Sequence, residues 1–286
     1  MMILVVLIIY YVQVKEYKKS EYYEQTKNEY LGVITDKGRN GEYRIYKYLS
    51  SLEGNKRYLF NIYLPKDDGE TTEIDVILLH DSGIYVFESK NYSGWIFGNE
   101  TQKNWTQTLP SGRGRSQKTK FFNPIMQNKG HIKWLKNYLK DDKLPIFSCI
   151  VFSDRCTLKK IEVTSGEHAV INRYNVLNAV RQNVQCRGVN LSLVQIEELY
   201  RKLYPLTQVD NVVKLAHIEA VNNKKAEAVS STSSGKVTSE CTNIDEVCPR
   251  CGGILKLRTA TKGKNKGSRF YGCSNFPKCR YVRDVE

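Results

Sequence analysis

Several features that mark other protein classes are missing from this 286-residue sequence. It has no Gly-x-x-x-x-Gly-Lys-Ser/Thr loop, so ATP-driven work is not expected. Only the last four of its eight cysteines are patterned, which is unlike the framework of a disulfide-rich secreted domain. The N-terminus lacks the basic region and small-residue cleavage site of a secretory signal. These absences favour a cytoplasmic protein with reduced thiols.

The one long apolar run of the sequence is short for a membrane-spanning helix. Residues 1–12 are apolar, whereas a membrane-spanning helix needs about 20 such residues. Lysines that begin at Lys15 would hold the rest of the chain on the cytoplasmic side. We therefore expect residues 1–14 to be a candidate anchor in the inner (cytoplasmic) membrane and residues 15–34 to be a juxtamembrane segment. The alternatives are a segment that lies in the membrane interface and a start site chosen inside a longer hydrophobic segment.

Positive charge, by contrast, is abundant. The chain has 44 Lys and Arg against 30 Asp and Glu, a formal net charge of +14. Such an excess favours a polyanionic partner, either nucleic acid or an anionic membrane surface, and does not indicate a fold. The length is sufficient for one substantial core and one small module.

The most informative stretch of the sequence contains two short apolar segments with charged ends. Residues 76–79 and 84–87 are rich in β-branched and aromatic side chains, and turn-forming residues separate them, which predicts two strands. Asp75 precedes the first strand, and Glu88 and Lys90 end the second. Because Glu88 and Lys90 are two residues apart, both side chains leave the same face of a sheet.

This arrangement can hold a metal ion. If the strands pair as a hairpin, Asp75 lies beside Glu88, and a hard cation would relieve the repulsion between the two carboxylates. Mg²⁺ binds through one or two carboxylates and keeps several waters for a phosphate substrate. The ammonium group of Lys90 could orient an attacking water or neutralise developing charge. The structural alternative is an ion pair at the strand end, with Asp75 as a turn residue.

The order Asp, strand, Glu-x-Lys resembles the signature of the PD-(D/E)XK nuclease superfamily. Flanking motifs make the resemblance more specific, and it is then closest to the NERD (nuclease-related domain) branch over about residues 35–139, with a less marked continuation to about 204. Those motifs are Gly38-Arg-Asn-Gly-Glu42, Glu73-Ile-Asp75, the run from Gly83 to Gly94, and Asn123-Pro-Ile-Met-Gln127.

The resemblance implies an α/β restriction-endonuclease-like core, in which helices flank a central mixed sheet. It implies that Asp75 and Glu88 bind Mg²⁺ or Mn²⁺ and that Lys90 assists the attacking water. It also implies that Glu42 is an accessory acid and that Gln127 holds the water or a phosphate. Without the resemblance, Glu42 would only complement a helix dipole, and Gln127 would be a surface residue.

The nuclease-like domain is expected over residues 35–205. Within it, residues 99–119 are polar and are expected to form a loop whose cations, Arg113, Arg115, Lys118 and Lys120 at its end, could follow a phosphate backbone. Composition shifts toward Lys, Ala, Ser and Thr after the domain, which predicts a flexible linker over residues 206–246.

Residues 247–286 contain two cysteine pairs, Cys248 with Cys251 and Cys273 with Cys279. Two such pairs, about twenty residues apart, suit a tetrahedral Zn²⁺ site with four sulfur ligands. The segment is too short to fold on core burial alone, so zinc would supply most of its folding free energy. It closely resembles the four-cysteine zinc finger of bacterial type IA topoisomerases. Two disulfides are the alternative.

The same segment is strongly basic. Between residues 247 and 283 there are ten cationic residues and no acidic ones, and aromatic residues are interleaved with them. Cations with aromatic platforms bind single strands, at about 1–3 kcal/mol per stacked base. Of the aromatic residues, Tyr271 and Phe276 are expected to pack on the zinc site. The residues expected to contact nucleic acid, without sequence preference, are Lys256, Arg258, Lys262, Lys264, Lys266, Arg269, Phe270, Lys278 and Arg280.

Two modules thus indicate the same polyanionic partner, DNA in preference to RNA. The leading hypothesis is a Mg²⁺-dependent nuclease that hydrolyses phosphodiester bonds and carries a DNA-binding zinc finger. The alternatives are a non-catalytic nucleic-acid-binding protein tethered to a membrane and a topoisomerase-like accessory factor. For the latter, no catalytic tyrosine can be singled out among the nineteen present.

Overall fold

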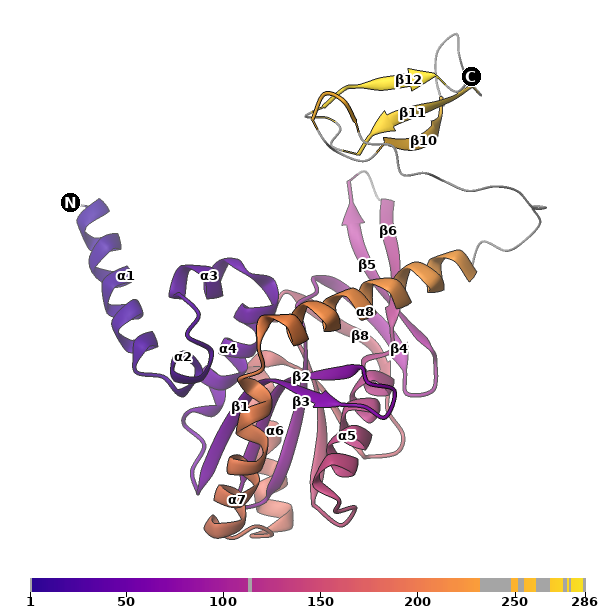
Figure 1. Ribbon diagram of the computed structural model, residues 1–286. Coiled ribbons are helices and arrows are strands. Elements are labelled where there is room, and N and C mark those ends of the chain that lie inside the picture. The colour runs from indigo at the N-terminus through magenta and orange to yellow at the C-terminus, as the bar shows by residue number, and fades with distance from the viewer. Residues whose placement is uncertain are drawn as a thin grey trace. The chain divides into compact units, whose positions relative to one another are not determined.

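The computed structural model describes residues 2–112, 115–231, 248–251, 255–260, 268–274, 277 and 279–284. The chain forms two compact units, Met1–Glu227 and Ala228–Glu286. Figure 1 shows the elements of both units.

The larger unit is a mixed α/β structure. Its α-helices, the last of which continues into the smaller unit, are α1 (Met2–Lys18), α2 (Glu21–Thr26), α3 (Tyr30–Thr35), α4 (Lys37–Leu49), α5 (Pro124–Leu139), α6 (Val176–Arg187), α7 (Leu193–Leu203) and α8 (Asn211–Ser231), with short 3-10 turns η1 (Arg173–Asn175) and η2 (Tyr204–Thr207). Its strands are β1 (Lys56–Pro65), β2 (Thr71–His80), β3 (Gly83–Lys90), β4 (Gly94–Asn99), β5 (Asn104–Ser111), β6 (Arg115–Phe122), β7 (Ile146–Phe152), β8 (Cys156–Glu162) and β9 (His168–Asn172).

The central sheet has the strand order β1-β2-β3-β7-β9. Strands β1, β2 and β3 are antiparallel, and β7 and β9 continue the sheet parallel to β3. The register places Val76 opposite Phe87 and Lys90 opposite Phe152. The predicted α/β class, with a mixed sheet flanked by helices, is confirmed.

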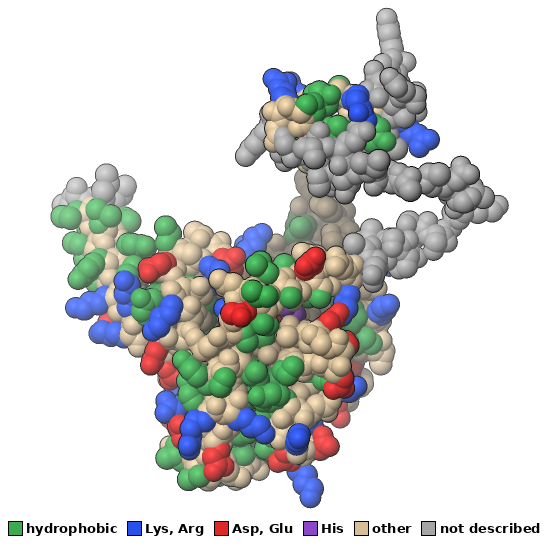
Figure 2. Space-filling view, viewed as in Figure 1, with side chains coloured by type: hydrophobic (Ala, Val, Ile, Leu, Met, Phe, Trp, Pro, Cys, Tyr) green, Lys and Arg blue, Asp and Glu red, His purple; other side chains and the backbone are tan. Residues whose placement is uncertain are grey.

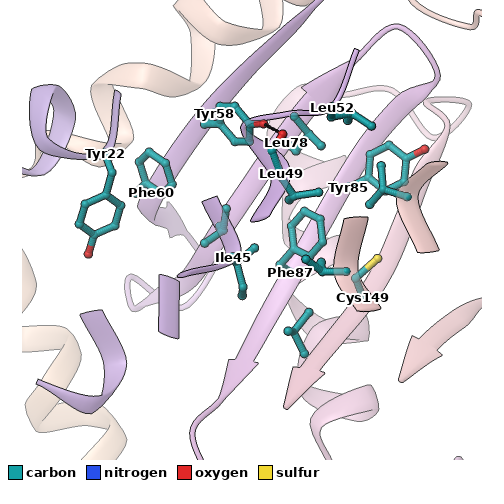
Figure 3. Packing of buried hydrophobic residues seen from close by; sticks show 14 of the residues in the cluster. Tyr22, Ile45, Leu49, Leu52, Tyr58, Phe60, Leu78, Tyr85, Phe87 and Cys149 are labelled. Carbon is teal, nitrogen blue, oxygen red and sulfur yellow. Dashed lines mark hydrogen bonds between the residues drawn. The ribbon is translucent and has the colours of Figure 1, made fainter. Parts of the chain in front are cut away.

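Alternating side chains of the sheet enter apolar cores on its two faces. Tyr58, Leu78 and Phe87 pack with Ile45 and Leu49 of α4 on one face (Figure 3). On the other face, alternate residues of the same strands pack against α5 and α7. Strands buried on both faces explain why their sequences are almost continuously apolar.

A second sheet corrects the expectation of a loop over residues 99–119. Strands β5 and β6 form an antiparallel hairpin. They belong to a sheet with the strand order β6-β5-β4-β8. The fully buried ring of Trp105 stacks on Phe152 with centroids 6.0 Å apart, which holds β5 against the domain. Much of β5 is exposed, which explains its polar sequence. Polar composition alone suggested a loop. Arg113 lies outside the described residues.

Residues 15–34 are part of the larger unit and not a separate segment. Tyr17 and Tyr22 are fully buried, and Val33 joins them in the core beside α4. The Tyr22 ring lies edge-on to Phe60 at 4.8 Å, and the Gln25 side chain donates to the Tyr58 carbonyl at 2.6 Å. Buried aromatic rings supply large contact areas, so this tyrosine-rich stretch belongs with the core.

The N-terminal half of α1 carries exposed apolar side chains, from Leu4 at 62% to Val12 at 51% exposure (Figure 2). Across the described parts of the chain, however, no helix combines the length and apolarity needed to cross a bilayer.

The first part of the expected linker, residues 206–246, is ordered in the structure. Residues 211–231 form α8, consistent with many helix-favouring Ala, Lys and Glu residues and no Gly or Pro. His217 of α8 contacts the hydroxyl of Thr71 at 3.0 Å, and its ring packs edge-on to Tyr63. The helix therefore packs against the start of β2.

The smaller unit contains a three-stranded antiparallel sheet, β10 (Leu255–Thr259), β11 (Arg269–Cys273) and β12 (Val282–Asp284). Among its described residues, the buried apolar side chains are Leu255 and three of the cysteines, with Tyr271 and Tyr281 packed against them. Phe276, which was also expected to pack there, lies outside the described residues.

Candidate active site and zinc centre

The end of β3 presents a buried ion pair to α5. Glu88 is 2% exposed, and its Oε1 lies 2.6 Å from Lys90 Nζ. Its Oε2 lies 3.1 Å from Nε2 of His131. The two-residue spacing of Glu88 and Lys90 places both side chains on the face covered by α5. The Glu88 carboxylate is thus held between two nitrogen groups.

Helix α5 supplies the side chains that hold this pair. Lys90 Nζ donates to Gln127 Oε1 at 2.9 Å, and His131 follows Gln127 by one helical turn. The helix begins at Pro124, where the Asn123 side chain accepts from the Ile125 amide at 2.9 Å. The contact between His131 and Glu88 could not be predicted from the sequence, because a lone histidine gives no sign of its partner.

Asp75 lies where β2 interrupts its regular alternation. Ile74 and Val76 are two residues apart, yet they pack into opposite cores. A regular strand would send both to one face. The Oδ2 of Asp75 accepts from the Ser89 amide at 2.7 Å. That bond ties Asp75 to the β3 segment between Glu88 and Lys90.

Glu42 approaches from the opposite face of the sheet. It is 7% exposed on α4, and its Oε2 accepts from the Tyr22 hydroxyl at 3.0 Å and from Asn61 Nδ2 at 3.1 Å. Asn61 interrupts β1 with a φ of 52°, a conformation that Asn tolerates better than most residues. Sequence reasoning missed Tyr22 and Asn61. A polar residue inside the apolar β1 segment is the only signal that could have pointed to Asn61.

The charges of the site differ in their response to burial. Burial alone would raise the pKa of Glu88, but Lys90 and His131 outweigh it and lower that pKa to about 2. Burial would lower the pKa of Lys90, but Glu88 and then Asp75 raise it. Glu88 and Lys90 are therefore both charged near neutral pH.

The other two carboxyls are shifted the opposite way. Burial raises the pKa of Asp75 well above its usual value, and the charges of Glu88 and Glu42 raise it further. Burial also raises the pKa of Glu42 to about 7, although the hydrogen bonds from Asn61 and Tyr22 oppose this. Strongly perturbed carboxyls in one place are typical of functional sites.

The donor set of Asp75 and Glu88 fits a hard divalent cation. Neither belongs to a group of three or more described side chains whose ligand atoms all lie within 4.8 Å of one another. Two carboxylates are nevertheless enough for Mg²⁺, which keeps waters in its remaining positions. A carboxylate has about four lone-pair sites, so Glu88 retains acceptor capacity beside its two nitrogen partners.

The smaller unit brings four thiols together. Cys248, Cys251, Cys273 and Cys279 have sulfur atoms that all lie within 4.8 Å of one another. The distances are 3.8 Å between Cys248 and Cys279 and 3.3 Å between Cys251 and Cys273. Disulfide sulfurs would be about 2.05 Å apart, whereas sulfurs around Zn²⁺ are about 3.8 Å apart for Zn–S bonds near 2.3 Å. The cluster therefore fits structural zinc.

The expected nucleic-acid contacts of this unit are described only in part. Arg258, Arg269 and Arg280 are exposed, and half-buried Phe270 pairs with Arg258 across β10 and β11. Lys256 lies on β10, but its side chain is not among those that the structure describes. Also outside the described residues are Lys262, Lys264, Lys266 and Lys278.

Comparison with known proteins agrees with both halves of this arrangement. A family model of the nuclease-related domain (NERD) matches residues 37–153, which include Glu42, Asp75, Glu88, Lys90 and Gln127. A family model of the topoisomerase DNA binding C4 zinc finger matches residues 245–286.

Two curated proteins are similar to parts of the chain. An uncharacterized protein of Bacillus anthracis is 32% identical over 191 residues, which cover 66% of this chain and 86% of that protein. DNA topoisomerase 1 of Methanocaldococcus jannaschii is 44% identical over 41 residues, 14% of this chain and 5% of the topoisomerase. No solved structure matches significantly. The chain therefore belongs to the nuclease-related-domain family and ends in a zinc ribbon of the topoisomerase C4 type.

Proposed function

We propose that the protein is a metal-dependent nuclease that hydrolyses phosphodiester bonds, in DNA rather than RNA. The observation that carries the proposal is the joining of Glu88, Lys90 and Gln127 beside Asp75 at the end of β3. An isolated ion pair at a strand end would not require a second, half-buried carboxylate or a polar helix side chain aimed at the ammonium group.

The proposed chemistry assigns a role to each side chain. Asp75 and Glu88 would hold Mg²⁺ or Mn²⁺, which supplies Lewis-acid polarisation of the phosphate when bound. Lys90, held in place by Glu88 and Gln127, would orient the attacking water and offset charge on the phosphate oxygens. Glu42, with a pKa raised by burial to about 7, is suited to accept a proton near neutral pH.

The zinc ribbon would hold nucleic acid near this site without reading its sequence. The exposed arginines of the described residues support phosphate contacts, for which affinity falls steeply with salt. Because the ribbon is joined to the nuclease-like domain, it would also raise the effective concentration of substrate there. The assigned contacts are the basic and aromatic residues named from the sequence, with Arg258, Arg269 and Arg280 the accessible members.

The test uses the full chain with labelled single- and double-stranded DNA and RNA, in Mg²⁺, in Mn²⁺ and in EDTA. Asp75→Asn keeps an acceptor for the Ser89 amide, and Lys90→Met keeps the length of the side chain. Asp141→Asn and Lys133→Met change exposed residues away from the site and serve as matched controls.

We expect metal-dependent cleavage that both site variants lose, by a factor of about 100 or more, and that both controls retain. Tight binding of nucleic acid by the wild-type chain, without cleavage under any metal condition, would instead establish the non-catalytic alternative.

For the location of the protein, we propose that α1 lies against the cytoplasmic face of a membrane. The support is the row of exposed apolar residues from Leu4 to Val12. Val6→Glu with Ile9→Glu should then abolish co-sedimentation with lipid vesicles. Unchanged sedimentation of this double variant would contradict the proposal.

A further inference from the structure

A basic pocket lies apart from the ion pair, where α3 and α4 meet the chain segments that follow β3 and β7. Its volume is about 580 Å³, within the range of about 300–1,000 Å³ for small-molecule sites. Its lining includes two carboxylates, Asp36 and Asp154, against a larger number of cations. The cations are Lys37, Arg44, Lys47, Arg155 and Arg173.

Arg173 is the unusual member of this lining. Arg173 is 2% exposed, yet its side-chain Nε and Nη2 atoms have no hydrogen-bond partner. The nearby carboxylate of Asp154 is used elsewhere, because it accepts from the Tyr174 amide at 3.0 Å and lies 3.6 Å from Arg44. A buried guanidinium without acceptors is costly. A ligand that supplied acceptors would remove that cost.

The pocket is fastened to the candidate active site. Asn91, which directly follows Lys90, accepts from Arg155 Nη2 at 2.8 Å and donates to the Lys37 carbonyl at 2.5 Å. Helix α4, which carries Glu42, contributes the wall from Lys37 to Lys47. If a nucleic-acid strand lay with its cleaved bond at Lys90, a group bound in the pocket would therefore lie beside that nucleic-acid strand.

We propose that this pocket binds a phosphate group of the nucleic-acid strand that flanks the cleaved bond. The identity of the ligand rests on the proposed nuclease function. On binding, the Arg173 side chain would turn its unpartnered Nε and Nη2 toward two phosphate oxygens, the paired geometry that guanidinium groups favour. Arg155 and Lys47 would complete the charge balance at the exposed rim.

The first measurement is the thermal stability of the full chain in phosphate-free buffer with EDTA, with and without inorganic pyrophosphate. We expect pyrophosphate to raise the Tm of the wild type but not that of Arg173→Met. Without ligand, Arg173→Met should itself raise the Tm, because it removes an unpaired buried charge. Arg155→Gln should reduce the pyrophosphate shift, and Arg181→Gln, which changes a half-buried arginine of α6 outside the pocket lining, should not.

The second measurement is the affinity for a single-stranded DNA 12-mer in buffer without Mg²⁺, Mn²⁺ or a chelator, so that no cleavage competes and the ribbon keeps its zinc. Arg173→Met should weaken binding about tenfold or more, since it removes a charge-assisted hydrogen bond. Arg155→Gln should weaken it less. Vesicles that contain anionic lipid are the comparison ligand and should bind both variants as they bind the wild type.

Several results would overturn the proposal. One is a lower Tm for Arg173→Met with an intact pyrophosphate shift, which would make Arg173 a structural residue. Another is loss of vesicle binding in place of DNA binding, which would identify a lipid headgroup. If Arg173→Met does not fold, an unchanged shift in Arg155→Gln overturns the proposal, and a reduced shift supports it. Asp75→Asn should keep the pyrophosphate shift, so failure of the nuclease proposal is distinguishable.

Discussion

Glu42 is a carboxyl group that the fold holds out of water between two neutral donors. Tyr22 and Asn61 both donate to Oε2, so the side chain is oriented in either protonation state. Its pKa of about 7 against an ordinary 4.5 reflects burial first. Because the native state binds this proton more tightly than the unfolded chain does, stability must fall as pH rises from about 4.5 to about 7.

Glu42→Gln should remove this pH dependence. Glutamine keeps an acceptor for Tyr22 and Asn61 but has no charge to bury. Above pH 7 we expect the variant to be more stable than the wild type by up to about 3 kcal/mol, and below pH 4 the two should be similar. Urea unfolding between pH 4 and pH 8 measures the difference. A constant difference across this range would show that Glu42 does not titrate with a raised pKa.

Only part of the site could be predicted from single residues. The spacing of Glu88 and Lys90 placed both on one face because strand side chains alternate with a period of two. The bonds of Glu42 to Tyr22 and Asn61 join residues about twenty positions apart, on different elements. No local rule encodes such contacts, since they depend on how α2 and β1 pack.

The N-terminal helices are elements whose role could not be predicted from composition. Residues 15–34 were expected to be a juxtamembrane segment, but Tyr17 and Tyr22 fill the core beside α4. The helix from Asn123, in contrast, was predictable, because an Asn cap followed by Pro at the first position is a strong local signal. Long-range burial has no comparable local signal.

A chain that lacks residues 1–34 should therefore lose much of its stability. Truncating one buried aromatic side chain costs about 3–5 kcal/mol, and this deletion removes both Tyr17 and Tyr22. With a total stability of about 5–15 kcal/mol, the shortened domain should be partly unfolded at 37 °C by circular dichroism. Deletion of residues 1–9, which precede these tyrosines, is the control. A native-like melt of the 1–34 deletion would contradict the packing described.

The hairpin of β5 and β6 carries its cations on a strand and not on a loop. Arg115, Lys118 and Lys120 are exposed along β6. If they follow a phosphate backbone, changing all three to Gln should reduce the slope of log affinity against log salt by about 2–3. Binding titrations between 50 and 200 mM salt measure this. The matched control changes Lys133, Lys140 and Lys143, and equal slopes in the two triple variants would exclude the hairpin from binding.

At the scale of the whole molecule, two compact units have different sources of stability. The larger has apolar cores on both faces of a sheet, and the described part of the smaller buries little besides Leu255 and cysteines. The cysteine spacing made the zinc ribbon predictable, since four sulfur ligands need little other context. The extent of the larger unit was harder to predict, because α1 to α3 and α8 join it through tertiary contacts.

Removal of zinc should therefore unfold only the smaller unit. A strong chelator, or Cys251→Ser, should abolish the calorimetric transition of the ribbon and weaken DNA binding, while the main transition keeps its Tm. Cys186→Ser changes an exposed cysteine outside the cluster and should alter neither. If chelation also lowers the main Tm by several degrees, the two units do not unfold independently.

The candidate-site residues, from Tyr22 to His131, are synthesised in an order that affects when the site can assemble. Their elements enter the chain in the order α2, α4, β1, β2, β3 and α5, and the Glu88–Lys90 ion pair lacks its helix partners until α5 has been synthesised. A ribosome-bound fragment that ends before α5 would carry the carboxylates without Gln127 or His131. Assembly late in translation would thus delay completion of the proposed nuclease site until most of the domain has been synthesised.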